Sequence, residues 1–237
     1  GVAVLINSRN DTESMMAALK DSDSVFVIAD EKRLTKLRDA GCDLPALVSA
    51  PDSQFASEKN STLFDSVFTH APMTTPVNLT QTDNASMLFT SGTTGLPKAS
   101  ITTHLKVFRS GSHMGLTVMN LTSDDVFYCA LPFYHSNALT LALSGTLMSG
   151  ATLAIGRKFS ASSFWDECRR HGATTFCYIG ELLRYLLTQP EQANDRDHNV
   201  VKILGNGLRP DIWMAFKNRF AIDRVHEFYG ASEGNSA

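Results

Sequence analysis

Short runs of apolar and β-branched residues alternate with longer amphipathic stretches through most of this 237-residue chain. The short runs have the length of strands, and the longer stretches repeat apolar residues every three to four positions, as helices with one buried face do. The predicted strands are residues 1–6, 25–29, 47–49, 85–90, 99–103, 125–130, 151–155, 174–179, 201–204 and 225–229. The predicted helices are residues 12–20, 32–40, 62–68, 105–119 and 181–188, with further helices beginning at 138, at Ser160 and at Pro210. This alternation predicts an α/β fold with mainly parallel sheets and helices packed on them.

The sequence also predicts the N-caps of two helices and one ion pair on a helix surface. Asp11 or Asn10 can cap the first helix, because a short acceptor side chain bonds the free N–H groups of a first turn. Ser160 is expected to do the same for a later helix. On that helix Asp166 and Arg170 lie four positions apart, which predicts an ion pair between them.

Composition narrows the class of protein. The chain is 43% hydrophobic and 19% charged, which is ordinary for a globular protein with a sizeable core. The net charge of −3 argues against a general nucleic-acid-binding protein. The four cysteines are scattered and form no C-x-x-C pair, which predicts reduced, buried thiols in a cytoplasmic protein.

One uncharged stretch, from Asn137 to Gly156, is long enough to span a membrane. Two serine–glycine pairs and several threonines divide it, so a buried helix followed by the strand over 151–155 is favoured. The chain begins with Gly1 inside a strand and ends at Ala237 directly after a motif described below. Both ends are therefore expected to be cuts through a larger protein.

The stretch from Met87 to Lys98 predicts a binding site for a polyphosphate. An apolar strand ends there in glycines, which let the backbone bend, and in hydroxyl side chains. Successive N–H groups in such a bend form an anion-binding nest, to which Lys98 adds positive charge. The Walker A loop does not fit, because Leu96 and Pro97 separate Lys98 from the glycine and a strand follows. A surface turn rich in small residues is the structural alternative.

Three further strand ends carry candidate chemistry. The segment from Tyr229 to Asn235 offers an aromatic face for a base, a hydroxyl for a phosphate and the Glu233 carboxylate for Mg²⁺. A strand-end turn with a solvated glutamate is the alternative. The sequence Gly205-Asn206-Gly207 reads as a tight turn that a ligand can approach closely, or as a turn with a structural role only. His135 follows another strand with no evident acid or metal partner.

These motifs resemble those of a known superfamily. The segment Thr90–Lys98 is similar to the phosphate-binding signature of adenylate-forming enzymes, and Tyr229–Glu233 is similar to their Tyr-Gly-x-Thr-Glu motif, with serine in place of threonine. The segments 157–165, 178–186 and 205–213 resemble the fatty-acid transport protein/very-long-chain acyl-CoA synthetase family, most closely a bacterial long-chain member. The chain would then be part of the large N-terminal AMP-binding domain, with the start of that domain and the whole C-terminal domain absent.

The resemblance implies roles for individual residues. Catalytic roles fall on Lys98, His135 and Glu233, and Glu233 is the metal ligand. The residues that would bind ATP are Thr90, Ser91, Gly92, Thr93, Thr94, Gly95, Lys98, Gly205, Asn206, Gly207, Tyr229, Gly230 and Ser232. The residues that would contact the acyl substrate are Phe133, His135, Tyr178 and Gly180.

The implied activity is that of an ATP-dependent fatty acid–CoA ligase that works through an acyl-adenylate. Its cofactors and co-substrates would be ATP, Mg²⁺ and CoA, and no nucleic-acid partner is expected. The alternatives are another adenylate-forming ligase, a fatty-acid uptake protein in peripheral contact with the inner face of a membrane, and a non-catalytic ATP-binding module. The fragment alone is expected to bind ATP weakly and not to complete thioester formation.

Overall fold

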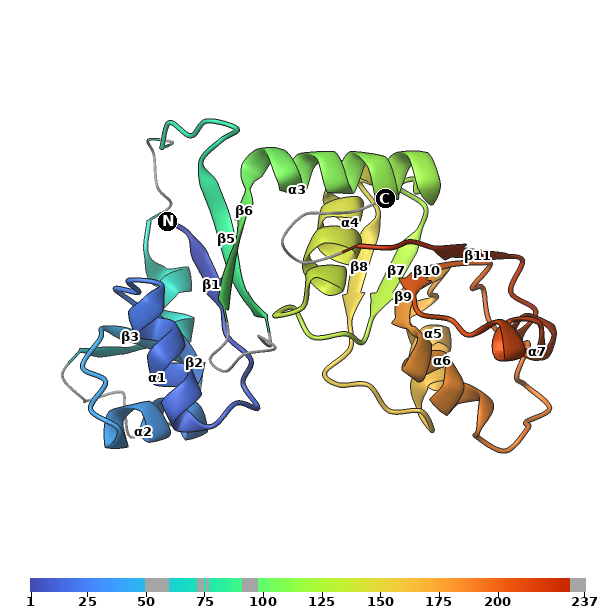
Figure 1. The fold of residues 1–237 in the computed structure, drawn as a ribbon, viewed down its shortest axis with the longest axis horizontal. Coiled ribbons are helices and arrows are strands. Elements are labelled where there is room, and N and C mark those ends of the chain that lie inside the picture. The colour runs from blue at the N-terminus through green and yellow to red at the C-terminus, as the bar shows by residue number, and fades with distance from the viewer. Residues whose placement is uncertain (50–59, 72–74, 76, 91–97, 231–237) are drawn as a thin grey trace. The chain divides into compact units, whose positions relative to one another are not determined.

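The computed structural model describes residues 1–49, 60–71, 75, 77–90 and 98–230. The chain divides into two compact units, Gly1–Ile101 and Thr102–Ala237, and each unit is described by itself. Figure 1 shows the helices and strands along the chain.

The first unit contains two three-stranded sheets, with strand orders β1-β5-β6 and β2-β3-β4. The strand pairs β1/β5, β2/β3 and β3/β4 are parallel. The elements are β1 (Ala3–Leu5), α1 (Thr12–Asp21), β2 (Val27–Asp30), α2 (Glu31–Asp39), β3 (Ala46–Ser49), β4 (Ser61–Leu63), the 3₁₀ helix η2 (Phe64–Thr69), β5 (Asn84–Thr90) and β6 (Lys98–Thr103), which runs on into the second unit.

Local chemistry explains the helix starts in the first unit. Asp11 caps α1, since its Oδ1 accepts the Ser14 N–H at 2.7 Å, and Asp30 caps α2 through the Arg33 N–H at 2.9 Å. Apolar residues of both helices pack against β2 and β3 around Leu34. The predicted helix over 62–68 is instead the short strand β4 followed by η2, because Ser61, Thr62 and Leu63 pair with β3.

The second unit is built on a five-stranded sheet with the order β11-β10-β9-β7-β8, and all of its strand pairs are parallel (Figure 1). This arrangement confirms the predicted α/β fold. The elements are α3 (His104–Ser110), the π-helix η3 (Gly111–Val118), β7 (Val126–Cys129), the π-helix η4 (Asn137–Leu143), α4 (Ser144–Ser149), β8 (Thr152–Ile155), α5 (Phe164–His171), β9 (Thr175–Ile179), α6 (Gly180–Leu187), β10 (Lys202–Asn206), α7 (Pro210–Phe220) and β11 (Arg224–Glu227).

Both faces of this sheet are buried, as expected for a parallel sheet. Successive side chains of a strand point to opposite faces, so Tyr128 and Phe127 enter different cores. The core around Tyr128 includes residues of α5, α6 and α7, with Phe164, Leu183 and Phe216 among them. The core around Phe127 lies against η3, η4 and the segments that flank them.

The predicted helix over 105–119 is present as α3 followed by η3, although glycine disfavours helices. Two of its glycines serve close packing against α4. A Cβ atom at Gly111 would lie 2.4 Å from the Ser144 carbonyl oxygen, and one at Gly115 would lie 2.8 Å from the Gly145 Cα. Only hydrogen atoms fit at these contacts, so the sequence accepts poor helix formers there.

Two predictions about α5 are wrong. Ser163, not Ser160, stands at its N-cap, and it makes no side-chain capping bond. The Ser160 hydroxyl instead lies 3.3 Å from the Ser162 hydroxyl. Asp166 pairs with Arg169 at 2.6 Å, because the two side chains are three positions apart on one face of the helix and Arg170 is taken by Glu167.

The remaining predictions about the core are confirmed. All four cysteines are free and buried. The uncharged stretch 137–156 folds into η4, α4 and β8. Among the residues that the structure describes, no helix is both long enough and apolar enough to cross a membrane.

Candidate functional site

Most of the predicted site residues in the second unit gather at one edge of its sheet. Because β7, β9, β10 and β11 are parallel, their carboxyl ends meet at this edge, which is where ligands bind in open α/β sheets (Figure 1). We call it the carboxyl edge. The residues at or just beyond these strand ends are Phe133 and His135 after β7, Tyr178 and Gly180 at β9, Gly205, Asn206 and Gly207 at β10, and Tyr229 and Gly230 after β11.

The predicted turn Gly205-Asn206-Gly207 needs a correction. Gly205 and Asn206 are the last residues of β10, because Gly205 pairs with Tyr178 on one side and with Glu227 on the other. The turn begins at Gly207, whose φ of +78° lies in the region that favours glycine. Thus β10 reaches further toward the carboxyl edge than its apolar run indicates.

Glycines allow the backbones of β9 and β10 to touch at this edge. A Cβ atom on Gly180 would lie 1.7 Å from the Gly207 carbonyl oxygen, and one on Gly205 would lie 2.2 Å from the Tyr178 carbonyl oxygen. Both contacts exclude any side chain. In the described structure Gly180 and Gly205 therefore set the position of the turn after β10.

The carboxylate of Glu227 accepts three hydrogen bonds at the same place. Its Oε2 accepts the Gly207 N–H at 3.1 Å, and its Oε1 accepts the Leu208 N–H at 3.0 Å and the Tyr178 hydroxyl at 2.7 Å. The motifs in the sequence did not point to this residue. The available signal was an acidic residue within an otherwise strand-like run, two positions before Tyr229.

Tyr178 lies inside the protein core with an exposed fraction of 0%. Burial, and next the Glu227 carboxylate, raise the pKa of its phenol, so the hydroxyl stays protonated and acts as a donor. The same hydroxyl also lies 3.2 Å from the His226 carbonyl oxygen. The hydrogen bonds of the Tyr178 hydroxyl are thus made with β11. The predicted contact of Tyr178 with an acyl chain stays a prediction.

The start of η4, directly after the loop that follows β7, is joined to the end of β10. The Asn137 side-chain amide donates to Asn206 Oδ1 at 2.8 Å, although the two residues are 69 positions apart in the sequence. His135 is exposed beside Tyr134, with 4.7 Å between the ring centres. Although much of His135 is exposed, loss of water around the rest of the side chain lowers the pKa of its imidazole, which favours the neutral form near pH 7. Phe133 is partly buried against the core around Phe127.

Tyr229 presents its ring at the surface of the second unit. It follows β11 by two residues and is 78% exposed, which is unusual for a large aromatic side chain. Gly230 beside it is also exposed. The predicted phosphate contact Ser232 and the predicted metal ligand Glu233 lie outside the described residues.

In the first unit, Thr90 ends β5 and Lys98 begins β6, so the predicted phosphate loop joins two neighbouring strands of one sheet. This agrees with the expectation that no helix follows the loop, unlike in a Walker A motif. Lys98 is exposed. The loop residues Ser91, Gly92, Thr93, Thr94 and Gly95 lie outside the described residues. Lys98 and Tyr229 belong to different units, so their convergence on one nucleotide stays a prediction.

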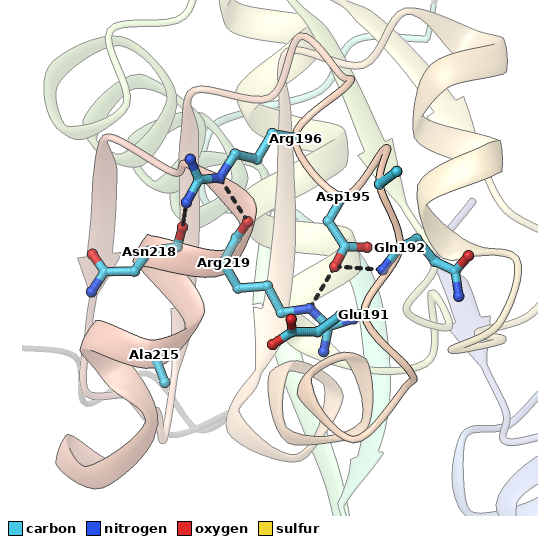
Figure 2. A pocket seen from close by; sticks show the side chains of 8 residues that line it. Glu191, Gln192, Asp195, Arg196, Ala215, Asn218 and Arg219 are labelled. Carbon is cyan, nitrogen blue, oxygen red and sulfur yellow. Dashed lines mark hydrogen bonds and ion pairs between the residues drawn. The ribbon is translucent and has the colours of Figure 1, made fainter.

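A separate hollow of about 490 Å³ lies between the loop after α6 and the end of α7 (Figure 2). The two arginines that line it form hydrogen bonds with other groups of this chain. Arg219 pairs with Asp195 at 2.7 Å and donates to carbonyl groups of the loop, while Arg196 donates to the carbonyl groups of Asn218 and Arg219. None of the predicted site residues lines this hollow.

The part of the chain that the structure describes holds no cluster of metal-binding side chains. Within that part, no group of three or more His, Cys, Asp or Glu side chains could hold a metal ion. The predicted metal ligand Glu233 lies outside this part, so its role stays a prediction.

Comparison with known proteins identifies the family. The sequence model of the family described as "AMP-binding enzyme" matches residues 1–237. The chain belongs to the AMP-binding enzyme family. This confirms the resemblance to adenylate-forming enzymes that the motifs indicated.

Similar curated proteins within the family include fatty-acid enzymes and transport proteins. The chain is 53% identical over 172 residues to the medium/long-chain-fatty-acid–CoA ligase FadD6 of Mycobacterium tuberculosis, which covers 71% of this chain and 29% of that protein. It is 42% identical over 216 residues to the mouse long-chain fatty acid transport protein 3, which covers 90% of this chain and 32% of that protein. The chain thus spans about a third of the length of these relatives.

Solved structures support the fold. An acyl-CoA synthetase from Brucella canis superposes with a TM-score of 0.87 at 20% identity, covering 100% of this chain and 44% of that one. ATP-bound MatB from Rhodopseudomonas palustris superposes with a TM-score of 0.81 at 23% identity, covering 100% of this chain and 46% of that one. At these identities the likeness concerns the fold of an AMP-binding domain.

Proposed function

We propose that the protein containing this chain is an ATP-dependent, AMP-forming ligase that joins long-chain fatty acids to CoA. The observation that carries the proposal is the carboxyl edge, where an exposed Tyr229, the Gly207 turn and His135 follow parallel strands of one sheet in an AMP-binding fold. The substrate class is supported by the similarity to FadD6, a medium/long-chain-fatty-acid–CoA ligase.

The chemistry begins with a carboxylate, which resists nucleophiles because it is negatively charged and has a poor leaving group. A carboxylate oxygen attacks the α-phosphorus of ATP, and the bond to pyrophosphate breaks to give an acyl-adenylate. The CoA thiolate then attacks the acyl carbon, and AMP leaves. Positioning and charge neutralisation supply most of the rate in such phosphoryl chemistry.

Each candidate residue has a place in this scheme. Tyr229, beside Gly230, stacks on the adenine, whose edge faces Gly205, Asn206 and Gly207. Phe133 and His135 lie at the acyl carboxylate, and His135 in its neutral form orients it without adding charge. Tyr178 and Gly180 lie beside the acyl chain.

The polyphosphate is assigned to the loop between β5 and β6. Its β- and γ-phosphates are held by Thr90, Ser91, Gly92, Thr93, Thr94, Gly95 and Lys98, with Ser232 adding a hydroxyl. These groups and the Glu233 carboxylate are hard oxygen donors or cations, which suit a Mg²⁺–nucleotide complex. When bound, Mg²⁺ neutralises charge on the phosphates, and Glu233 is the residue that holds it.

The test is ATP–pyrophosphate exchange by the full-length protein with fatty acids of graded length and with benzoate. We expect exchange with long fatty acids and none with benzoate. Replacing Lys98 by alanine should reduce exchange about 100-fold or more, as loss of a transition-state charge partner does. The exposed Lys20 serves as the control, and Lys20→Ala should exchange like the wild type. Exchange with aryl acids alone would assign another ligase, and no exchange with any acid would leave a non-catalytic ATP-binding module.

The similarity to long-chain fatty acid transport proteins favours a second role in uptake at a membrane surface. Flotation with liposomes tests it, since a membrane-associated protein rises with the vesicles and a protein that stays at the bottom contradicts this role. We also expect residues 1–237 alone to bind ATP weakly and to make no acyl-CoA. Robust acyl-CoA production by this piece would contradict the assignment of the chain to part of an N-terminal domain.

A further inference from the structure

We propose that Glu227 is a positioning residue, which holds the turn at Gly207 and the Tyr229 ring at one fixed spacing so that both meet the same adenine. The inference rests on the proposed function and adds a specific determinant of nucleotide affinity to it. It assigns Glu227 no part in the chemical step.

The hydrogen bonds of Glu227 tie three strands together. The residue ends β11, and its carboxylate crosses to the turn after β10, where it accepts the N–H groups of Gly207 and Leu208 at 3.1 and 3.0 Å. The Tyr178 hydroxyl of β9 donates to the same carboxylate at 2.7 Å. An ionised carboxylate only accepts hydrogen bonds, so it can satisfy all three donors at once.

The anchor of this arrangement is rigid. Tyr178 is completely buried, and its backbone touches Gly205 so closely that no side chain fits between them. A deeply packed residue cannot shift without disturbing its neighbours. The buried Tyr178 hydroxyl therefore fixes the position of the Glu227 carboxylate, and the carboxylate in turn fixes the Gly207 turn.

The position of Tyr229 follows from the same strand. Glu227 pairs in register with Gly205, and the next residue, Phe228, donates its N–H to the Gly205 carbonyl at 3.0 Å. The chain thus runs alongside β10 up to the residue before Tyr229. Any movement of β11 would move Tyr229 and release the Gly207 turn together.

Two variants each remove a different hydrogen bond of Glu227. Glu227→Gln can keep its amide oxygen at the Oε1 position, where it accepts Leu208 and Tyr178, but its NH₂ group then faces the Gly207 N–H with no acceptor. Tyr178→Phe keeps both backbone bonds and removes the anchor alone. Glu191→Gln makes the same chemical change at an exposed residue on the loop after α6 and serves as the matched control.

The experiment measures ATP binding to the full-length protein by isothermal titration calorimetry, and the KM values for ATP and for fatty acid in the exchange assay. We expect Glu227→Gln to weaken ATP binding about 10-fold, Tyr178→Phe about 3-fold, and Glu191→Gln not at all, since hydrogen bonds to charged groups are among the stronger ones. For Glu227→Gln the KM for fatty acid should stay within about 2-fold of the wild-type value, as positioning of the adenine alone predicts.

The outcomes separate this inference from the proposed function. Unchanged ATP affinity in Glu227→Gln, or an equal rise of both KM values, would overturn the positioning role and leave a purely structural residue. Failure of the wild type to exchange with any fatty acid would overturn the proposed function. In that case the calorimetric affinities for ATP still decide the role of Glu227.

Discussion

Asn137 donates its side-chain amide hydrogen to Oδ1 of Asn206 at 2.8 Å, which joins the first residue of η4 to the last residue of β10. The loop that leads into η4 carries His135 and Phe133, and β10 leads into the Gly207 turn. The proposed acyl and adenine sides of the site are therefore connected by a direct side-chain contact across the carboxyl edge.

We predict a measurable coupling between these two asparagines. Asn137→Ala and Asn206→Ala should each lower the free energy of unfolding by about 1 kcal/mol, and the double variant should lose less than the sum, because one hydrogen bond is removed in each case. Urea denaturation of the four proteins gives the coupling. Asn218→Ala, at an exposed residue of α7, is the control. Strict additivity would show that the contact contributes nothing to stability.

The close approach of Gly180 to Gly207 predicts a large effect of one methyl group. Gly180→Ala would place a Cβ atom 1.7 Å from the Gly207 carbonyl oxygen, so β10 or α6 must shift. We expect a loss of about 2–3 kcal/mol in the free energy of unfolding, typical of overpacking, together with weaker ATP binding.

Gly172→Ala is a useful comparison for this variant. Gly172 has φ of +63°, and a Cβ atom added there would have no neighbour within 4 Å. Alanine at this position would therefore cause backbone strain but no steric clash. A loss of about 1 kcal/mol with unchanged ATP binding is expected. If Gly180→Ala behaved like Gly172→Ala in both measurements, the packing at the carboxyl edge would not matter for the site.

A buried ion pair should control the acid stability of the second unit. Lys202 Nζ lies 2.9 Å from Asp125 Oδ2, and the two side chains are only 6% and 11% exposed. Burial opposes ionisation of Asp125, yet hydrogen bonds from Thr174, Thr122 and Lys202 outweigh it and lower the pKa of the carboxyl below its usual 3.8. The stabilisation is therefore complete above pH 3.8 and is lost as the pH falls through the lowered pKa.

Lys202→Met leaves this carboxylate without its cation, which should cost about 3–5 kcal/mol at pH 7. The pKa of Asp125 should then rise, so the difference from the wild type should shrink as the solution is acidified and Asp125 takes up a proton. Thermal unfolding between pH 3 and pH 8 measures both effects. Lys158→Met, at an exposed position, should follow the wild-type curve. A constant difference at all pH values would contradict the ion-pair account.

The four buried cysteines should resist thiol reagents in the native protein. Burial raises the pKa of the Cys168 thiol, which keeps it protonated and unreactive. Treatment with a bulky maleimide, followed by mass spectrometry of peptides, should leave Cys42, Cys129, Cys168 and Cys177 unmodified until guanidinium is added. Rapid native labelling of any of them would show that its part of the core opens readily.

The sequence predicted the fold well where the signal is local. Strand-length apolar runs such as 174–179 recur at the spacing of βα units, and the parallel sheet followed from this alternation. Glycine-bearing strand ends pointed to the carboxyl edge for the same reason. The extension of β10 through Asn206 was missed, because glycine disfavours strands and its pairing with Tyr178 and Glu227 depends on neighbours far away in the sequence.

The contacts that organise the site were harder to predict. Glu227 lies in a strand and would ordinarily face water, and its three donors come from β9 and from the turn after β10. Asn137 meets Asn206 only after the sheet has formed. The pairing of Asp166 with Arg169 shows the same problem at short range, since positions three and four residues away compete on a helix and side-chain rotamers decide between them.

The edge strand β11 is the last of the five sheet strands to leave the ribosome. Until it docks, the Gly207 and Leu208 amides have no acceptor from Glu227, and Tyr229 has no fixed place. A nascent chain can thus complete most of its sheet while its ligand-facing surface is still unformed. The proposed adenine contacts of this sheet would then form together, when β11 docks.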